Sequence, residues 1–215
     1  MKHKYPWQVY LEHPLKRRPF RGGSLITNQH VITAAHCFTN IPKKLETFFL
    51  KYPQYLRVSV GDHNWKDEEF KFVTLSKILI HPNHSPDDYL YDVAILTLSE
   101  RIELSNKVSP ICLPSSAGDY AGELGTVTGW GQVDVPFDED NHHLVYTGAY
   151  LPHELQVANS SIISNEECQH HPMFANWRNI SESELCSMTP GSTCQGDSGG
   201  PIFIMESERF ESIHI

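Results

Sequence analysis

The segment at residues 194–201, Cys-Gln-Gly-Asp-Ser-Gly-Gly-Pro, is the feature that most limits how this chain can fold. It places Ser198 next to Asp197 and among glycines, in a stretch with almost no side-chain bulk. Such a turn can expose a serine hydroxyl while neighbouring backbone N–H groups converge on one point, as in a nucleophile with its oxyanion hole. Serine is a weak nucleophile at neutral pH. The fold must therefore bring a histidine base and a carboxylate to Ser198 from elsewhere in the sequence.

Two upstream segments supply these partners. His36 lies in Thr33-Ala34-Ala35-His36-Cys37, and Asp92 precedes the apolar run Val93-Ala94-Ile95-Leu96, so the chain order is His, Asp, Ser. Taken alone, a histidine before a cysteine is usually structural, and an aspartate at such a position could merely end a turn. Together with the serine turn, they predict an acyl-transfer site.

With these residues the chain resembles the chymotrypsin/trypsin family of serine proteases. The resemblance covers almost the whole sequence and includes Tyr5-Pro6-Trp7-Gln8-Val9, Gly22-Gly23-Ser24-Leu25-Ile26, Ile80-His81-Pro82, Pro110-Ile111-Cys112-Leu113-Pro114 and Thr128-Gly129-Trp130-Gly131. It implies a serine endopeptidase that hydrolyses polypeptide substrates and can meet protein protease inhibitors. It implies neither a cofactor nor a catalytic metal.

The resemblance also implies a role for each site residue. Ser198 is the nucleophile, His36 the general base and Asp92 the group that orients the imidazole. The backbone N–H groups of Gly196 and Ser198 form the oxyanion hole. Asp197 corresponds to the family's zymogen switch, which in active members pairs with the α-amino group released by proteolytic activation.

Specificity in this family is determined at the base of the primary pocket, six residues before the nucleophile. Ser192 stands there, and a neutral residue resembles the chymotrypsin-like pattern that favours large apolar substrate residues. Gln195 borders the expected pocket entrance.

The family pattern is incomplete at both ends of the sequence. Active members begin with an Ile-Val-Gly-Gly-like segment just before the match to Pro6-Trp7-Gln8, and without it Asp197 is expected to lack a partner. After Met205 the family continues through a Ser-Trp-Gly strand, a cysteine and a terminal helix, none of which is present. A barrel without closing strands exposes backbone edges and is weakened. A catalytically inactive protease-like binding domain, or an incomplete fragment, is therefore the alternative to an active peptidase.

Short runs of β-branched and aromatic residues followed by turn residues recur along the chain and predict an all-β protein. The resemblance implies two antiparallel six-stranded Greek-key barrels, the second incomplete, with the site in the crevice between them. Spacing alone would equally suit a sandwich. We expect one peptidase domain, with a first barrel at about 5–105, a linker at about 106–122 and a truncated second barrel at about 123–215. The predicted strands are 7–11, 23–26, 31–33, 56–60, 70–73, 77–80, 94–98, 125–131, 154–158 and 201–204.

Two segments, 40–55 and 134–153, are expected to be long surface loops. Such loops tune access or specificity, or they are simply solvated insertions.

The five cysteines are few for a fold built on disulfides but ordinary for a secreted enzyme. The resemblance implies one bridge, between Cys168 and Cys186. It leaves Cys37, Cys112 and Cys194 without evident partners, and Arg21 stands where the partner of Cys37 would be. The simplest interpretation of these three is buried free thiols.

The formal charge of −9 argues against nucleic-acid binding, and no apolar run is long enough to cross a membrane. Lys16-Arg17-Arg18 and Arg21 form one basic cluster, expected on an exposed loop. Sequons at Asn83, Asn159 and Asn179 agree with secretion, although no signal peptide precedes Tyr5.

Three other groups of residues invite a metal-site interpretation. Asp62 and Glu68 stand where some family members bind Ca²⁺, but surface carboxylates are the simpler interpretation. The pairs His142-His143 and His170-His171 lack the spacing of a zinc site and are more simply solvated histidines.

Overall fold

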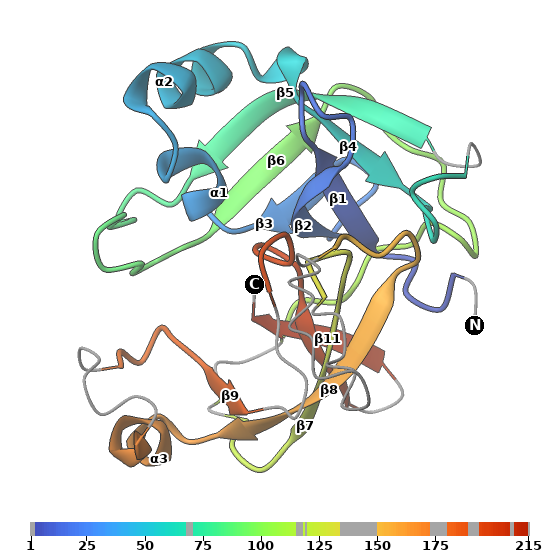
Figure 1. Cartoon of the computed structure of the whole chain (residues 1–215). Helices are drawn as coiled ribbons and strands as arrows, with labels where there is room; N and C mark the ends of the chain where they lie inside the picture. The colour runs from blue at the N-terminus through green and yellow to red at the C-terminus, as the bar shows by residue number, and fades with distance from the viewer. Residues whose placement is uncertain are drawn as a thin grey trace, which may run out of the picture.

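A computed structural model describes residues 3–67, 71–114, 118, 120–133, 150–172, 180–188, 194–206 and 209–214. Two β units lie one above the other in Figure 1, with the N-terminal unit at the top. The chain passes from the upper unit to the lower one after β6.

The upper unit is a closed antiparallel barrel in the strand order β1-β2-β3-β6-β5-β4. It encloses most of the hydrophobic core, including Leu11, Leu25, Val58, Leu75 and Leu96, all with no exposed surface. Its strands are β1 (Gln8–Glu12), β2 (Pro19–Leu25), β3 (His30–Thr33), β4 (Arg57–Val60), β5 (Lys71–Ile80) and β6 (Ala94–Leu98).

The lower unit is an open five-stranded sheet in the order β11-β10-β7-β8-β9. Its own core is small and centres on Ile162, Ile202 and Ile204. The prediction of an all-β protein with a six-stranded first barrel and an incomplete second one is confirmed. The strands are β7 (Leu124–Gly129), β8 (Gln156–Ile163), β9 (Cys186–Met188), β10 (Ile202–Glu206) and β11 (Arg209–His214).

Several elements differ from the sequence-based expectation. The strands predicted at 70–73 and 77–80 are one strand, β5, in which Val73, Leu75 and Ile78 are the buried residues. A bulge between Leu75 and Lys77 shifts the alternation by one residue, so the pattern divides in the sequence while the strand continues.

Helices are the other difference. The expected loop at 40–55 contains α2 (Lys43–Lys51) and the 3₁₀-helix η1 (Pro53–Tyr55), and α1 (His36–Thr39) precedes it. Helix α3 (Asn165–His170) has Ser164 as its N-cap, which accepts a hydrogen bond from the Glu167 N–H. This Ser-x-x-Glu pattern is a capping signal that the sequence analysis missed. Most of the expected loop at 134–153 lies outside the described residues.

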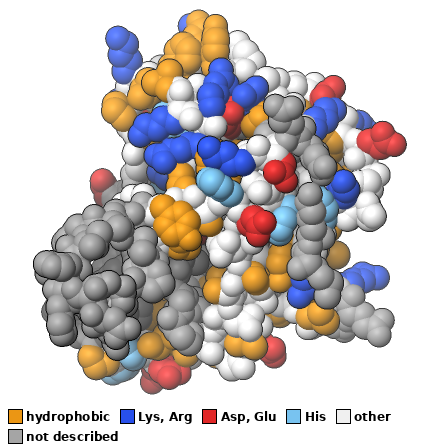
Figure 2. All heavy atoms as spheres, turned by 45° about the vertical axis from the view of Figure 1, so that its right-hand side comes forward, with side chains coloured by type: hydrophobic (Ala, Val, Ile, Leu, Met, Phe, Trp, Pro, Cys, Tyr) orange, Lys and Arg blue, Asp and Glu red, His pale blue; other side chains and the backbone are white. Residues whose placement is uncertain are grey.

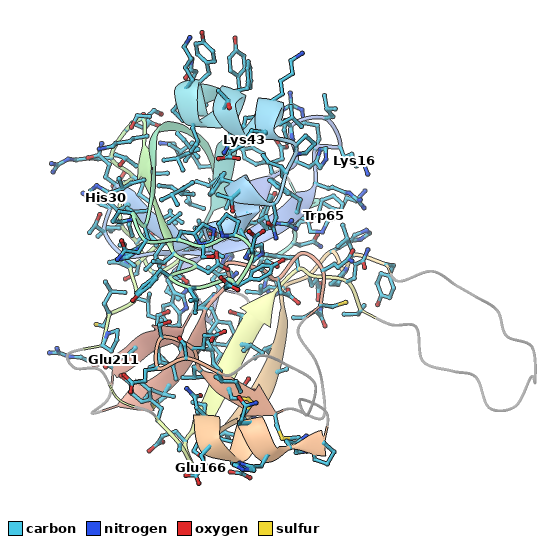
Figure 3. The ribbon with its side chains drawn as sticks, turned by 90° about the vertical axis from the view of Figure 1, so that its left-hand side faces the viewer. Lys16, His30, Lys43, Trp65, Glu166 and Glu211 are labelled. Atoms are coloured by element: carbon cyan, nitrogen blue, oxygen red, sulfur yellow. A yellow bond between two sulfur atoms is a disulfide. The ribbon has the colours of Figure 1, made fainter. Side chains whose placement is uncertain are left out.

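The two units join through the segment after β4. The Trp65 N–H donates to His153 O at 3.1 Å, and the Leu155 N–H donates to His63 O at 2.8 Å. The Trp65 indole donates to Pro152 O at 2.8 Å, and Figure 3 shows Trp65 where the two units meet. Aromatic contacts extend this junction, with Trp7 against Phe203 at 5.3 Å between ring centroids. β1 therefore faces the barrel core on one side and the lower unit on the other, which explains why all five of its residues are buried.

The cysteines follow the expected pairing. Cys168 and Cys186 form a disulfide that links α3 to β9, with the Cα atoms 6.2 Å apart. Cys37, Cys112 and Cys194 are free thiols. The expectation that all three are buried is correct for Cys37 but wrong for Cys112, which is exposed, and Cys194 is half-buried.

Asp62 is a buried carboxylate at the start of the junction segment. It is 8% exposed, so the expectation of a surface carboxylate is wrong. Burial raises its pKa to about 6, although hydrogen bonds from Tyr10, Ser59 and the His63 and Asn64 backbone partly oppose the shift. Between about pH 4 and 6 the folded state thus holds a proton that the unfolded state has released.

We expect the Asp62→Asn substitution to change the pH dependence of stability. The wild-type free energy of unfolding should fall as pH rises from about 4 to 6, because the buried Asp62 carboxyl resists ionisation in the folded state. Above this pH range Asp62 should cause no further change. The variant should therefore gain roughly 2–3 kcal/mol relative to wild type between pH 4 and 7. Urea unfolding at four pH values measures this change. Asp87→Asn, at an exposed position, is the matched control, and parallel curves for Asp62→Asn and wild type would contradict the prediction.

Candidate active site

His36 and Asp92 lie at adjacent ends of two paired strands. His36 follows β3, and Asp92 precedes β6, whose Ala94 pairs with Thr33 of β3. The imidazole Nδ1 is 2.6 Å from Asp92 Oδ2, and the His36 backbone N–H donates to Asp92 Oδ1 at 2.7 Å. The carboxylate therefore holds both the ring and the backbone of His36, leaving Nε2 as the ring nitrogen that can exchange a proton with a substrate or a serine.

The surroundings of Asp92 favour its charged form. Burial by itself raises the pKa of Asp92, but the two hydrogen bonds from His36 and the nearby His36 and His84 imidazoles outweigh it. The pKa of Asp92 consequently lies below its ordinary value. The Tyr89 ring meets the His36 ring edge to face at 5.7 Å and restricts its orientation from another side.

His84 is a functional candidate that the sequence analysis missed. Its side chain is 3% exposed, and its Nδ1 lies 3.2 Å from Leu90 O and 3.9 Å from Asp92 Oδ1. Its Nε2 is hydrogen-bonded to Thr39 Oγ1 at 3.0 Å. The ring thus joins α1, which carries His36, to the segment that carries Asp92. No local sequence signal distinguishes it from the neighbouring exposed residues of the sequon.

Ser198 lies in a turn held against the barrel by backbone contacts. Its carbonyl accepts a hydrogen bond from the Gly22 N–H at 2.8 Å, and the Cys37 thiol lies 3.7 Å from the same oxygen. Burial raises the pKa of Cys37 to about 12, so the thiol stays protonated and can donate. This contact places Ser198 beside Cys37, the residue after His36 in α1, although no hydrogen bond joins the Ser198 and His36 side chains within the described residues.

The glycines of this turn are required by close approach. Gly199 has a φ of +83°, and a Cβ there would overlap Thr33 Oγ1 and meet Gly22 O at 2.8 Å. Gly196 has a φ of +108°, a region that residues with side chains rarely adopt. The turn can therefore be formed only with glycine at these positions.

Asp197 points away from Ser198 into the lower unit. Its carboxylate accepts hydrogen bonds from the Gly131 N–H at 2.7 Å and the Cys194 N–H at 3.0 Å. Burial raises the pKa of Asp197, and these two bonds partly oppose the shift. The backbone therefore supplies two donors to Asp197, and its expected lack of an α-amino partner stays a prediction.

A pocket of about 480 Å³ opens beside Ser198. Gln195 lines it, together with residues of β7 and β9 such as Val127 and Ser187. Ser192, the predicted base of the primary pocket, lies outside the described residues.

The described parts of the chain contain no group of three or more His, Cys, Asp or Glu side chains that could hold a metal ion. Asp62 is buried against Tyr10 and Ser59, whereas Glu68, His142 and His143 lie outside those parts. His170 and His171 are adjacent at the end of α3, and the His170 Nδ1 contacts Glu166 O. None of the described helices is long and apolar enough to span a membrane.

Comparison with known proteins shows similarity to serine proteases. The trypsin family model matches residues 1–211. Mouse ovochymase-2 is 33% identical over 94% of this chain, and the Drosophila melanogaster serine protease filzig and serine proteinase stubble are 32% and 31% identical over 96% and 93% of it. The chain spans only 30%, 12% and 24% of these three relatives, respectively. From its sequence and its fold, the chain belongs to the chymotrypsin/trypsin family of serine proteases.

Proposed function

We propose that the chain is a serine endopeptidase that cleaves polypeptides through an acyl-enzyme on Ser198. The observation that carries this proposal is the His36–Asp92 pair, in which one carboxylate holds both the imidazole and the backbone of His36. Such an arrangement prepares a histidine to act as a general base.

In the proposed mechanism, Ser198 Oγ attacks the scissile carbonyl carbon while His36 Nε2 takes the hydroxyl proton. Asp92 stays ionised, fixes the imidazole tautomer and stabilises the imidazolium. The backbone N–H groups of Gly196 and Ser198 bind the developing oxyanion, a contribution of about 3 kcal/mol per donor in enzymes of this kind. His36 then returns the proton to the leaving amine. A water molecule then attacks the acyl carbon while His36 Nε2 takes its proton, and His36 returns this proton to Ser198 Oγ as the ester bond breaks and the carboxylic acid leaves.

The substrate preference and the location of the protein are part of the proposal. The neutral Ser192, which stands in the sequence where trypsin-like members carry a carboxylate, supports a preference for a large apolar side chain on the acyl side of the cleaved bond. Asn83 and Asn159 are exposed, as glycosylation would require, and the disulfide suits an extracellular protein. Protein protease inhibitors would compete for the same surface.

A protease-like binding domain without activity is the second candidate. Two observations favour it: the Ser198 and His36 side chains are not hydrogen-bonded to each other, and Arg21 replaces the half-cystine expected opposite Cys37. Catalytic hydrogen bonds in proteases often form only in the complex with substrate, so the first observation is compatible with both candidates.

Covalent labelling distinguishes the two functions. A fluorophosphonate probe should label the purified protein at Ser198, identified by peptide mass analysis, and prior denaturation should abolish labelling. The His36→Ala substitution should slow the reaction by several orders of magnitude, on the scale of about 10³ or more. A folded wild-type protein that takes up no probe at Ser198 would leave the binding domain as the function.

His84 provides a further prediction within this mechanism. His84→Phe removes both hydrogen bonds of the imidazole, so the segment carrying Asp92 and the helix carrying His36 lose one of their connections. We expect kcat to fall about tenfold with an unchanged KM, because a displaced base affects the chemical step. His84→Asn keeps a donor near Leu90 O and should recover part of the rate. Equal kcat for wild type and His84→Phe would show that His84 has no positioning role.

A further inference from the structure

A groove of about 650 Å³ opens on the barrel between the loop at residues 13–18 and helix α2. Its floor is apolar and includes Phe38 and Leu56, which are almost completely buried. Its rim carries Leu15, Leu45 and Phe48, which are 87%, 46% and 39% exposed. The groove is distinct from the pocket beside Ser198, with which it shares no lining residue.

Helix α2 presents apolar side chains that nothing in the described chain covers completely. None of its nine residues is buried, although it contains Leu45, Phe48, Phe49 and Leu50. The Phe48 ring packs against three other aromatic rings, those of Phe49, Tyr52 and Tyr55. Contiguous exposed apolar surface of this kind, with a polar border, is typical of an interaction site.

The charge around the groove is opposite to that of the rest of the chain. Residues 12–57 contain eight Lys and Arg residues but only two Asp and Glu residues, which gives a formal charge of +6. The rest of the chain contains nine Lys and Arg residues and 24 Asp and Glu residues, which gives a formal charge of −15. Both acidic residues of the stretch are already paired, Glu12 with Arg17 and Arg57, and Glu46 with Lys43. Figure 2 shows Lys and Arg side chains gathered around hydrophobic ones in the upper part of the molecule, and Figure 3 shows Lys16 and Lys43 at the same end of the barrel.

Arg21 supplies a specific donor inside the groove. One of its terminal nitrogens donates to Phe20 O at 3.0 Å, but its Nε is buried and has no hydrogen-bond partner. Among the described residues, neither an Asp nor a Glu lines the groove to accept from it. The positive charge of the Arg21 guanidinium, which lines the groove, would attract a carboxylate of an incoming ligand.

We propose that this groove binds an extended acidic peptide segment with large apolar side chains, presented by a protein partner. The apolar floor takes the hydrophobic side chains, and the cationic rim with Arg21 takes the carboxylates. A sulfated polysaccharide would match the charge but would leave the floor and the α2 side chains uncovered, so a peptide fits the surface better. The surrounding positive field also accelerates association with an acidic partner.

The proposal is independent of peptidase activity and is tested in a Ser198→Ala protein, which cannot cleave the probe. The probe is fluorescein-labelled Glu-Leu-Glu-Asp-Phe-Glu, followed by fluorescence anisotropy at 50 mM NaCl. Two matched peptides separate charge from apolar contact: Gln-Leu-Gln-Asn-Phe-Gln and Glu-Gly-Glu-Asp-Gly-Glu. We expect the first peptide to bind at least about tenfold more tightly than either of the others.

Paired substitutions locate the binding. Leu45→Ser with Phe48→Ser should weaken binding about tenfold, whereas Leu79→Ser, at a 54% exposed position on β5, should not. Lys16→Glu with Lys44→Glu should weaken binding to a similar extent. Lys66→Glu with Lys77→Glu makes the same change of charge at exposed positions outside residues 12–57 and should have little effect.

Three results would overturn the proposal. The first is equal binding of the acidic peptide with and without its Leu and Phe, and the second is no loss of binding in the Leu45→Ser, Phe48→Ser protein. The third is tight binding of heparin that depends on Lys16 and Lys44 but not on Leu45 and Phe48, while the peptide does not bind. That pattern would identify a polyanion-binding surface in place of a peptide groove.

Discussion

Replacing Ser198 with alanine is expected to lower kcat for a peptide substrate by a factor on the order of 10⁴ to 10⁶, with little change in KM. The substitution removes only the attacking oxygen. The turn itself is held through the Ser198 carbonyl, by the Gly22 N–H and the Cys37 thiol, and through Gly199. Substrate binding should therefore survive while the chemical step is lost.

Ser24→Ala is the matched control for this experiment. Ser24 is fully buried in β2, and its hydroxyl has no hydrogen-bond partner. Its removal should leave kcat unchanged. Steady-state kinetics with a chromogenic peptide carrying a large apolar residue before the cleaved bond measures both variants. Turnover by Ser198→Ala above about one hundredth of the wild-type rate would show that Ser198 is not the nucleophile.

Most strands of the barrel were predictable because each is encoded by a short local run of β-branched and apolar residues. Runs such as Val31-Ile32-Thr33 and Ala94-Ile95-Leu96-Thr97-Leu98 form β3 and β6 close to the predicted bounds. The bulge in β5 and the short strand β9 were not predicted, because their pairing depends on neighbouring strands that are distant in sequence.

The candidate site was predictable only in part, for a similar reason. His36, Asp92 and Ser198 lie in recognisable motifs, but His84 acquires its contacts from Thr39 and Leu90, which come from two different segments. The donors to Asp197 likewise come from Gly131 and Cys194, and only the folded chain brings them together. The groove was not predicted, because its residues come from two separate segments of the sequence. One is the cationic loop at 13–18, and the other is the segment at 40–55, which was expected to be a loop but forms α2 and η1.

The carboxylate of Asp197 lies between two glycines, and this close fit makes Gly131 a sensitive position. A Cβ on Gly131 would overlap both the Cγ and Oδ2 atoms of Asp197. Gly131→Ala must therefore move the carboxylate, which loses its hydrogen bond from the Gly131 N–H. Because Asp197 is flanked by Gly196 and Ser198, the displacement reaches both proposed oxyanion donors.

We expect Gly131→Ala to lower kcat by roughly 10² to 10³, the size of effect seen when an oxyanion-hole donor is lost, and to lower kcat/KM equally. Stability should fall by about 1–3 kcal/mol, because a buried carboxylate loses a donor. Gly118→Ala is the control, since a Cβ there meets the Tyr120 ring at an ordinary 3.6 Å. Thermal unfolding establishes that each variant is folded before its kinetics are compared. If Gly131→Ala is folded and retains the wild-type kcat, Asp197 does not shape the oxyanion hole, and the Gly196 and Ser198 N–H groups must be held by the turn alone.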